Sequence, residues 1–123
     1  MTQEEKQLLL IDLCARLPYG VKVKFYSMEY PYGSEPVILT VHLLKDRWEN
    51  IYDVKPYLRP MSSMTEEERI EFERLSFVYD TSDGSMLFSE KGLDWLNTNY
   101  FDYRGLIEKG LALEAPKGMY KTE

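Results

Sequence analysis

Two prolines constrain the fold of this chain more than any other feature of its sequence. Within the segment Lys55–Pro60, Pro56 and Pro60 fix φ, lack backbone N–H donors and bias the residues before them toward extended geometry. The segment therefore predicts an extended connector that is neither a helix nor a central strand. The sequence before it has mostly the pattern of strands, and the sequence after it mostly that of helices.

The length of the chain predicts one domain. It has 123 residues, the size of one ordinary domain, and cutting it at the prolines would leave two halves too small to bury good cores. With 44% hydrophobic and 29% charged residues, the composition is globular rather than disordered. We expect a single domain over residues 1–123, with a polar tail that frays from about residue 116.

The first residues predict a capped helix. Thr2 and Glu5 have the spacing of a capping box, and Pro18 and Gly20 end the helix, which runs from Gln3 to Leu17. Helical spacing places five residues on one broad face, which we expect to be buried: Leu9, Leu10, Leu13, Cys14 and Leu17. This interpretation makes Cys14 a buried structural thiol.

Alternating residues predict an antiparallel hairpin after this helix. Residues 21–26 point Val21, Val23 and Phe25 inward, and residues 37–44 form the return strand, with Val41 nearly buried and His42 in a structural role. A loop rich in proline, glycine and tyrosine joins the two strands. A third strand is expected over residues 48–54.

The second half predicts mostly helices. A strong start near Thr65 opens a helix to about residue 75, a second helix runs from Ser89 through Asn97, and Asp102 caps a short one that ends at Gly110. A hairpin over residues 77–88 and a strand over 111–114 complete the pattern. The predicted fold class is α+β: an N-terminal helix packed on a small antiparallel sheet of three to five strands, with a helical C-terminal half.

Enzymatic signatures are missing from the sequence. It has one histidine and one cysteine, no serine nucleophile elbow and no phosphate-binding glycine loop, so we assign no catalytic, cofactor or metal residues. The longest apolar run, Leu8–Ile11, is far too short to span a membrane. An acidic N-terminus and a single cysteine favour the cytoplasm over export.

The ten tyrosines favour a protein partner, because tyrosine and tryptophan are enriched at interfaces. We expect a non-enzymatic protein-interaction or regulatory module, a monomer or weak homodimer. The candidate partner-binding residues lie on the connector and around the turn into the short capped helix, with Asp102 nearby: Tyr57, Arg59, Trp95, Tyr103 and Arg104. In the alternative interpretation, Asp102 only caps its helix and the two arginines pair with local acids.

Two other functions stay open at this point. Residues 103–109 followed by 113–121 resemble a recognition helix and wing, which makes a winged-helix DNA-binding protein the second candidate. The net charge of −6 disfavours nucleic acid as a partner, because such binding depends on clustered lysine and arginine. A small hydrolase is the third candidate, since two of the 21 acidic residues could pair in space.

Several stretches resemble a known group of proteins. Residues 55–68 (KPYLRPMSSMTEEE) and 101–107 (FDYRGLI), together with residues 95–97 and 13–21, are similar to an uncharacterised family of small cytoplasmic proteins from gut bacteria and their mobile elements. The resemblance covers roughly half the chain. It implies a phage or mobile-element accessory protein and no particular activity, because none is established for the family.

Overall fold

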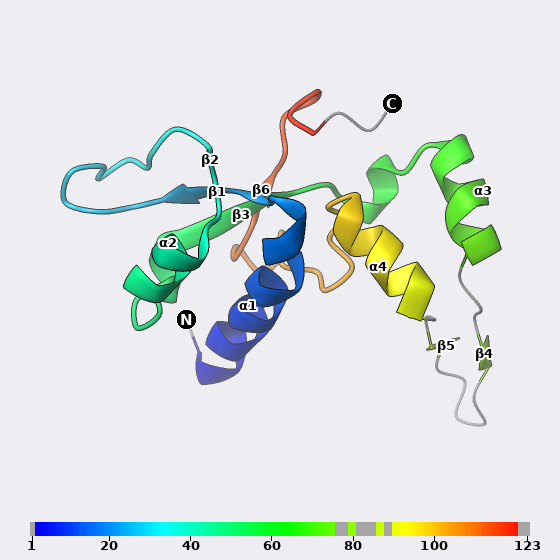
Figure 1. Cartoon of the computed structure of the whole chain (residues 1–123), viewed down its shortest axis with the longest axis horizontal. Helices are drawn as coiled ribbons and strands as arrows, with labels where there is room; N and C mark the ends of the chain where they lie inside the picture. Colours follow the sequence, from blue (N-terminus) through cyan, green and yellow to red (C-terminus); the bar gives the residue numbers. More distant parts are fainter. Residues whose placement is uncertain (1, 76–78, 81–85, 88–89, 121–123) are drawn as a thin grey trace.

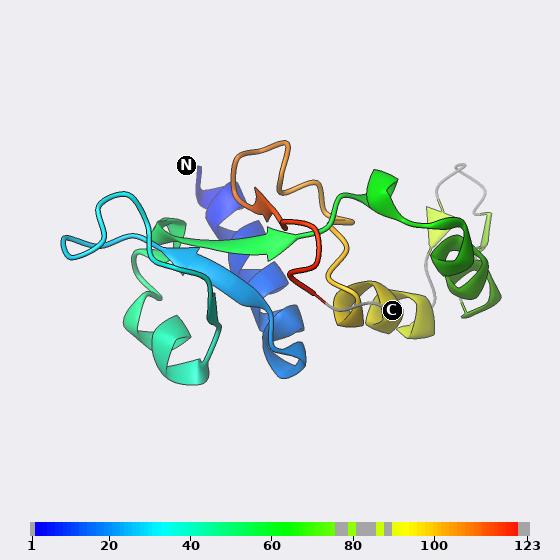
Figure 2. The same ribbon diagram turned by 90° about the horizontal axis from the view of Figure 1, so that it is seen from above.

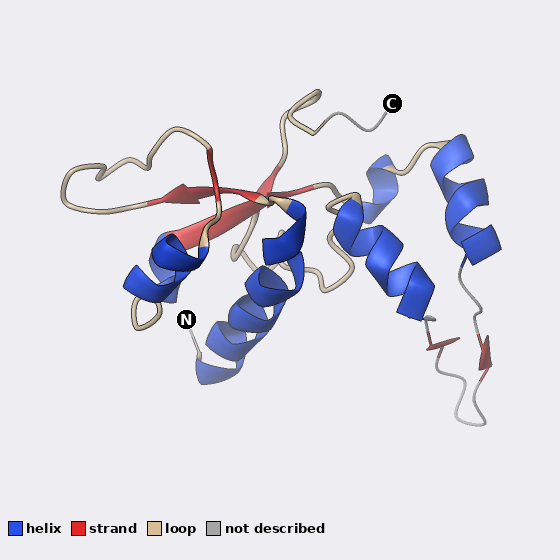
Figure 3. Ribbon diagram, viewed as in Figure 1, coloured by secondary structure: helices blue, strands red, loops and turns tan. Residues whose placement is uncertain are grey.

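A four-stranded mixed sheet with helices before and after it forms the frame of the molecule, which confirms the α+β prediction (Figures 1 and 3). The computed structural model describes residues 2–75, 79–80, 86–87 and 90–120. Its strand order is β2-β1-β3-β6, and β4 and β5 pair separately. The helices are α1 (Gln3–Arg16), α2 (Val41–Asp46), α3 (Glu66–Leu75) and α4 (Glu90–Thr98). The strands are β1 (Lys22–Phe25), β2 (Val37–Ile38), β3 (Val54–Leu58), β4 (Tyr79–Asp80), β5 (Met86–Leu87) and β6 (Leu113–Glu114). Short 3₁₀ turns are η1 (Leu17–Tyr19), η2 (Ile51–Asp53) and η3 (Met61–Ser63).

The first helix begins as its sequence predicts. The Thr2 hydroxyl accepts a hydrogen bond from the Glu5 N–H at 3.1 Å, and the Glu5 carboxylate accepts one from the Thr2 N–H at 2.9 Å. Leu9 and Leu13 are fully buried against the sheet residues Val21 and Val23. The predicted burial of Cys14 is wrong: the helix turns a different face inward, and Cys14 is exposed.

The connector prediction is also wrong, because residues 54–58 form the central strand β3, between β1 and β6. The Tyr26 N–H donates to the Asp53 carbonyl at 2.9 Å. Hydrogen-bonded and non-hydrogen-bonded pairs alternate along antiparallel strands. Counting from the hydrogen-bonded pair Tyr26–Asp53, Pro56 and Val23 form a non-hydrogen-bonded pair, so Pro56 needs no N–H toward β1. On its other side, the parallel pairing with β6 starts one residue later, at Tyr57. The missing proline N–H therefore interrupts neither ladder.

The predicted return strand stops early. β2 covers only residues 37–38, and Thr40 then caps α2 by accepting a hydrogen bond from the Leu43 N–H at 3.1 Å. Val41 is consequently 52% exposed and His42 lies exposed on a helix, contrary to both predictions. The third strand begins later than expected, at Val54, after the η2 turn.

Two of the helices predicted in the second half are confirmed as α3 and α4. Part of the predicted hairpin is also present, because β4 pairs antiparallel with β5. The other hairpin residues, Phe77, Val78 and Phe88, lie outside the described residues. The short helix predicted after Asp102 is replaced by turns, because Gly105 adopts a left-handed φ of 72°. The strand predicted over residues 111–114 forms as β6 and pairs parallel with β3, so the sheet is mixed and not wholly antiparallel as predicted.

The hydroxyl of Tyr120 completes the sheet. Beyond Val23 and Pro56, the register makes Lys22 and Tyr57 the next hydrogen-bonded pair of β1 and β3. The Tyr120 hydroxyl lies between them: it accepts from the Lys22 N–H and donates to the Tyr57 carbonyl, both at 2.8 Å. Burial raises the pKa of the Tyr120 phenol, which keeps the hydroxyl protonated as a donor. The tail therefore docks as far as Tyr120 instead of fraying from residue 116.

Two apolar clusters fill the molecule. The larger one lies between α1 and the sheet, and the smaller one surrounds Trp95, Leu96 and Phe101. Figure 2 shows that α4 lies beyond the end of β3. Backbone bonds join the two clusters: the Arg59 N–H donates to the Tyr100 carbonyl, and the Asp102 N–H to the Arg59 carbonyl, each at 2.8 Å. The chain thus forms one small α+β domain.

Leu13→Ala tests the packing of α1. We expect a loss of about 2–5 kcal/mol in the free energy of unfolding, measured by urea denaturation, because the change leaves a cavity in the larger cluster. Ile11→Ala on the exposed side of the same helix is the control and should cost under about 0.5 kcal/mol. Equal losses for the two variants would refute the described orientation of α1.

Tyr120→Phe tests the bridging hydroxyl. The ring is kept, but the Lys22 N–H and the Tyr57 carbonyl lose their partner, so we expect a loss of about 1–3 kcal/mol in the free energy of unfolding. Amide exchange at Lys22 should accelerate selectively. Tyr52→Phe is the matched control, because the Tyr52 hydroxyl is exposed and its hydrogen bond goes to the nearby Asn50 side chain. Unchanged exchange at Lys22 would contradict the bridge.

Candidate functional site

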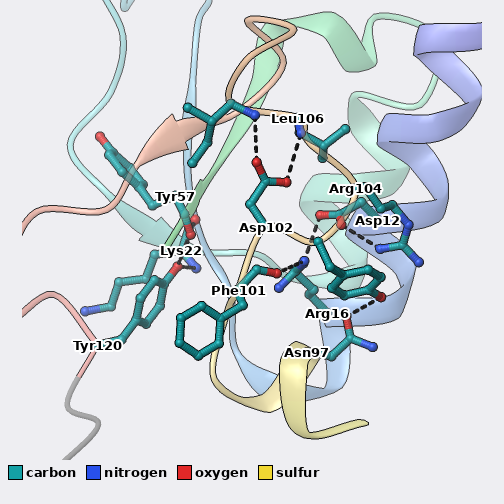
Figure 4. A network of polar contacts seen from close by, with 12 residues as sticks. Asp12, Arg16, Lys22, Tyr57, Asn97, Phe101, Asp102, Arg104, Leu106 and Tyr120 are labelled. Carbon is teal, nitrogen blue, oxygen red and sulfur yellow. Dashed lines mark hydrogen bonds and ion pairs between the residues drawn. The ribbon is translucent and has the colours of Figure 1, made fainter. Parts of the chain in front are cut away.

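The most unusual polar group in the structure is the fully buried guanidinium of Arg16 (Figure 4). Its Nε donates to an oxygen of Asp12 at 3.0 Å, and its Nη2 donates to the Phe101 carbonyl at 2.6 Å. Arg104 donates to the other oxygen of Asp12, also at 2.6 Å. One fully buried carboxylate is therefore shared by two arginines, and it links α1 to the chain that follows α4.

The ring of Tyr103 lies beside both guanidinium groups and stabilises their positive charge. The guanidinium carbons of Arg16 and Arg104 lie 5.3 and 4.6 Å from the centre of that ring, within cation–π range. The Tyr103 hydroxyl donates to the Asn97 side chain at 2.9 Å. Within the described ranges, Nη1 of Arg16 is the one buried side-chain nitrogen or oxygen that lacks a hydrogen-bond partner.

A tight turn at the end of α4 sets the position of the Phe101 carbonyl. The Phe101 N–H donates to the Leu96 carbonyl at 2.9 Å and the Tyr100 N–H to the Asn97 carbonyl at 3.2 Å, which together form a Schellman motif. The motif puts Tyr100 at a positive φ of 64°, a conformation that glycine normally supplies. Tyr100 is held there by a hydrogen bond from its hydroxyl to the Tyr19 carbonyl and by stacking on Tyr120.

The carboxylate of Asp102 accepts hydrogen bonds from the Leu106 and Ile107 N–H groups, at 2.8 and 2.9 Å. It therefore caps the backbone as expected, although turns follow instead of a helix. With both oxygens of Asp12 paired to arginines as well, neither buried carboxylate is free to act as a general acid or base.

Arg59, the residue that follows β3, forms a second charged contact. It donates to both oxygens of Glu68, at 2.8 and 2.7 Å, and its guanidinium carbon lies 4.2 Å from the centre of the Phe101 ring. The hydrogen bonds from Arg59 lower the pKa of the Glu68 carboxyl. Each of the two side chains is more than four-fifths buried.

The five residues predicted to bind a partner fall into separate internal contacts. Tyr103 and Arg104 come together beside Arg16, while Arg59 and Trp95 meet at the Phe101 ring, which Trp95 stacks at 5.6 Å. Tyr57 belongs to neither group and is buried in β3. Both arginines pair with acids of the chain: Glu68 is local to Arg59, as the alternative interpretation has it, whereas Asp12 lies 92 residues before Arg104.

Exposed aromatic residues are found instead on the loop between β1 and β2, which projects from one end of the molecule (Figure 1). Tyr32 is 91% exposed and Tyr30 41%, and Met28 beside them is fully exposed. This loop is the hairpin end where the tyrosines of the first half gather in the sequence.

An apolar groove of about 500 Å³ lies on the outer side of α1. Its lining comes from one helix and from the segment after α2: Gln7, Leu10, Ile11, Cys14 and Trp48. Ile11 is 57% exposed and Trp48 48%. The sequence contains one signal for this groove. A helix at the surface buries one apolar stripe, and the four consecutive apolar residues 8–11 cannot all lie on that stripe, so some of them must face outward.

A second cavity, of about 560 Å³, lies between η3 and the C-terminal segment. Arg59 and Ser63 form one side, and Glu114 and Lys117 belong to the other. Arg59 is already paired with Glu68, and the remaining two charges have opposite signs. The charges around this cavity therefore favour neither an anionic nor a cationic ligand.

The described residues contain no group of three or more histidine, cysteine, aspartate or glutamate side chains placed to hold a metal ion. None of the helices among them has both the length and the apolar character that a bilayer crossing requires.

Comparisons of the chain with protein-family models, curated proteins and solved structures found no match. The resemblance to proteins of gut bacteria and their mobile elements therefore stays a prediction. Any functional proposal has to rest on the surfaces described above.

Glu68→Gln tests the charged contact at Arg59. A lowered folded-state pKa means that the carboxylate stabilises the fold above its usual pKa of 4.5 and loses this effect as pH falls through the folded value. We expect the wild type to be more stable than the variant at about pH 6 and this difference to shrink by about pH 3 in urea melts. The neighbouring Glu67→Gln, at an exposed position, should show no such pH-dependent difference. A Glu68→Gln difference that is constant with pH would contradict the ionic contact.

Proposed function

We propose that the protein is a non-enzymatic interaction module that binds a protein partner through the apolar groove on α1. The observation that carries this proposal is the pair of exposed large apolar side chains, Ile11 and Trp48, that line the groove. Exposed apolar area costs about 25 cal/mol per Å² relative to burial, so a contiguous patch of this kind marks a binding surface. Tryptophan is also among the residues that dominate binding energy at interfaces.

The shape of the groove favours an amphipathic segment as the bound part of the partner. A volume of about 500 Å³ takes a few apolar side chains, as when the apolar face of a helix docks in a groove. Gln7 supplies an amide that can donate and accept hydrogen bonds beside that apolar contact. The groove lies on the side of α1 turned away from the sheet, so a partner reaches it without disturbing the core.

The other two candidate functions have less support. A winged helix needs a recognition helix, and residues 103–110 form turns. A two-carboxylate hydrolase needs acids that are free to react, whereas Asp12 and Asp102 both use their oxygens in internal hydrogen bonds.

Cys14 allows a direct test, because it is the chain's only cysteine and lies in the groove. Labelled there with a photocrosslinker, the protein should capture a partner from a lysate of its source cells. With the captured protein purified, Trp48→Ala should weaken binding by at least about thirtyfold, the effect of one hot-spot residue. Calorimetry measures the dissociation constants.

The matched control is Val41→Asp, which places a charge on an exposed apolar residue outside the groove. It should leave the dissociation constant unchanged, whereas Ile11→Asp should abolish binding. A partner that binds Ile11→Asp and Trp48→Ala as tightly as the wild type would refute the groove as the binding site.

A further inference from the structure

Three lysines share the face of the sheet that α1 does not cover, the side seen in Figure 2. Val21 and Val23 point toward α1, so Lys22 and Lys24 point away from it, and Lys55 lies directly opposite Lys24. In the described part of the chain, no carboxylate lies within 4.0 Å of any of the three ammonium groups. The Lys22 ammonium donates to the Met119 carbonyl at 3.4 Å. Lys24 and Lys55 are like charges directly opposite each other, an arrangement that destabilises a sheet unless something else compensates it.

The lysine face, as we call Lys22, Lys24, Lys55 and Ile38, is held in position. The Lys24 side chain packs against Gly33, where an added Cβ would lie 2.1 Å from the lysine Cε, and its ammonium lies 6.0 Å from the centre of the Tyr26 ring. Ile38 pairs with Lys22 from the edge strand β2 and is 56% exposed. An apolar residue therefore borders a fixed cluster of positive charge.

The complementary surface lies on α3. Glu66 and Glu73 pair with Arg69, and Glu68 pairs with Arg59, but Glu67 and Glu71 are exposed and have no ion pair or hydrogen bond among the described residues. These two lie one helical turn apart with Ile70, 56% exposed, on the same side of the helix. We call Glu67, Ile70 and Glu71 the acidic face.

The spacings of the two faces agree. Residues four apart on a helix have Cβ atoms about 5–6 Å apart, and a hydrogen-bonded antiparallel pair such as Lys24 and Lys55 has Cα atoms about 5.5 Å apart. Each carboxylate of the acidic face can therefore meet one lysine, and Ile70 can meet Ile38. Arg74 lies at the carboxyl end of the same side of α3, so a docking in which that end extends past the lysines avoids repulsion between like charges.

A single chain cannot make this contact, because α3 lies at one end of the molecule and β1 lies in the sheet, well apart from it in both views (Figures 1 and 2). We propose that the lysine face of one copy binds the acidic face of a second copy, so that the protein self-associates head to tail. The contact joins two different surfaces, so a pair of molecules that makes it once keeps one free face of each kind and can bind further copies. The net charge of −6 makes the association weak, and the contact itself weakens as salt screens its charges.

Sedimentation velocity across a concentration series tests the proposal. For the wild type at about 20 mM salt, the weight-average sedimentation coefficient should rise with concentration, and at about 0.5 M salt it should stay at the monomer value. Lys24→Glu/Lys55→Glu and Glu67→Lys/Glu71→Lys should each remain monomeric at low salt. Lys24→Gln/Lys55→Gln is the milder form of the first variant, and circular dichroism checks that all of them fold.

Mixing the two charge-reversed variants gives the sharpest result. Each lacks complementary faces of its own, but together they restore both contacts, so the mixture should associate at low salt although both proteins keep a negative net charge. Lys91→Glu/Lys109→Glu, at exposed lysines elsewhere, makes the same charge change as the first variant and should associate like the wild type.

Three results would overturn the proposal: a wild type that stays monomeric at low salt, association that survives Lys24→Glu/Lys55→Glu, or no association in the mixture. A wild type that stays monomeric but binds heparin through these lysines would instead assign the lysine face to polyanions. The Trp48→Ala variant should self-associate normally, which separates this contact from the groove on α1.

Discussion

The rest of the structure depends on how the charge of Arg16 is balanced inside the protein. A buried guanidinium costs several kcal/mol in lost hydration unless partners replace the water. Asp12, one turn earlier on α1, supplies the carboxylate, but the Phe101 carbonyl and the Tyr103 ring come from some 85 residues further along. The Nε and Nη2 groups of Arg16 therefore both have partners only when α1 and the chain after α4 are in place together. That requirement selects one docking of the two halves from the many that apolar contact alone would permit.

Fixing Phe101 has consequences in both directions along the chain. Toward α4, it requires the Schellman turn and the positive φ of Tyr100, and the Tyr100 ring then stacks on Tyr120. Toward β3, it puts the Phe101 ring under Arg59, and Arg59 is in turn held by Glu68 of α3. The smaller apolar cluster is thus attached to the sheet through one aromatic ring and the charged residues on either side of it.

Elements whose determinants are local could be predicted from the sequence, and elements set by distant partners could not. The capping box of Thr2 and the alternation over β1 are complete within a few residues, and both predictions hold. Thr40 fits a strand pattern and a helix cap equally well, and only the tertiary structure decides for the cap. Pro56 is tolerated in a central strand because it falls in a non-hydrogen-bonded pair with β1. That position depends on the strand register, which cannot be read from the sequence.

The same reasoning explains the candidate sites. Arginine, tyrosine and tryptophan are common at interfaces because they make cation–π and stacking contacts, and those contacts serve equally well inside a chain. Residue type selected Arg59, Trp95 and Arg104, yet each one has its partner within the molecule. The better criterion is a side chain whose chemistry calls for a partner that its own chain does not supply. Trp48 in the groove on α1 and Lys24 opposite Lys55 meet that criterion, one through exposed apolar area and the other through uncompensated charge.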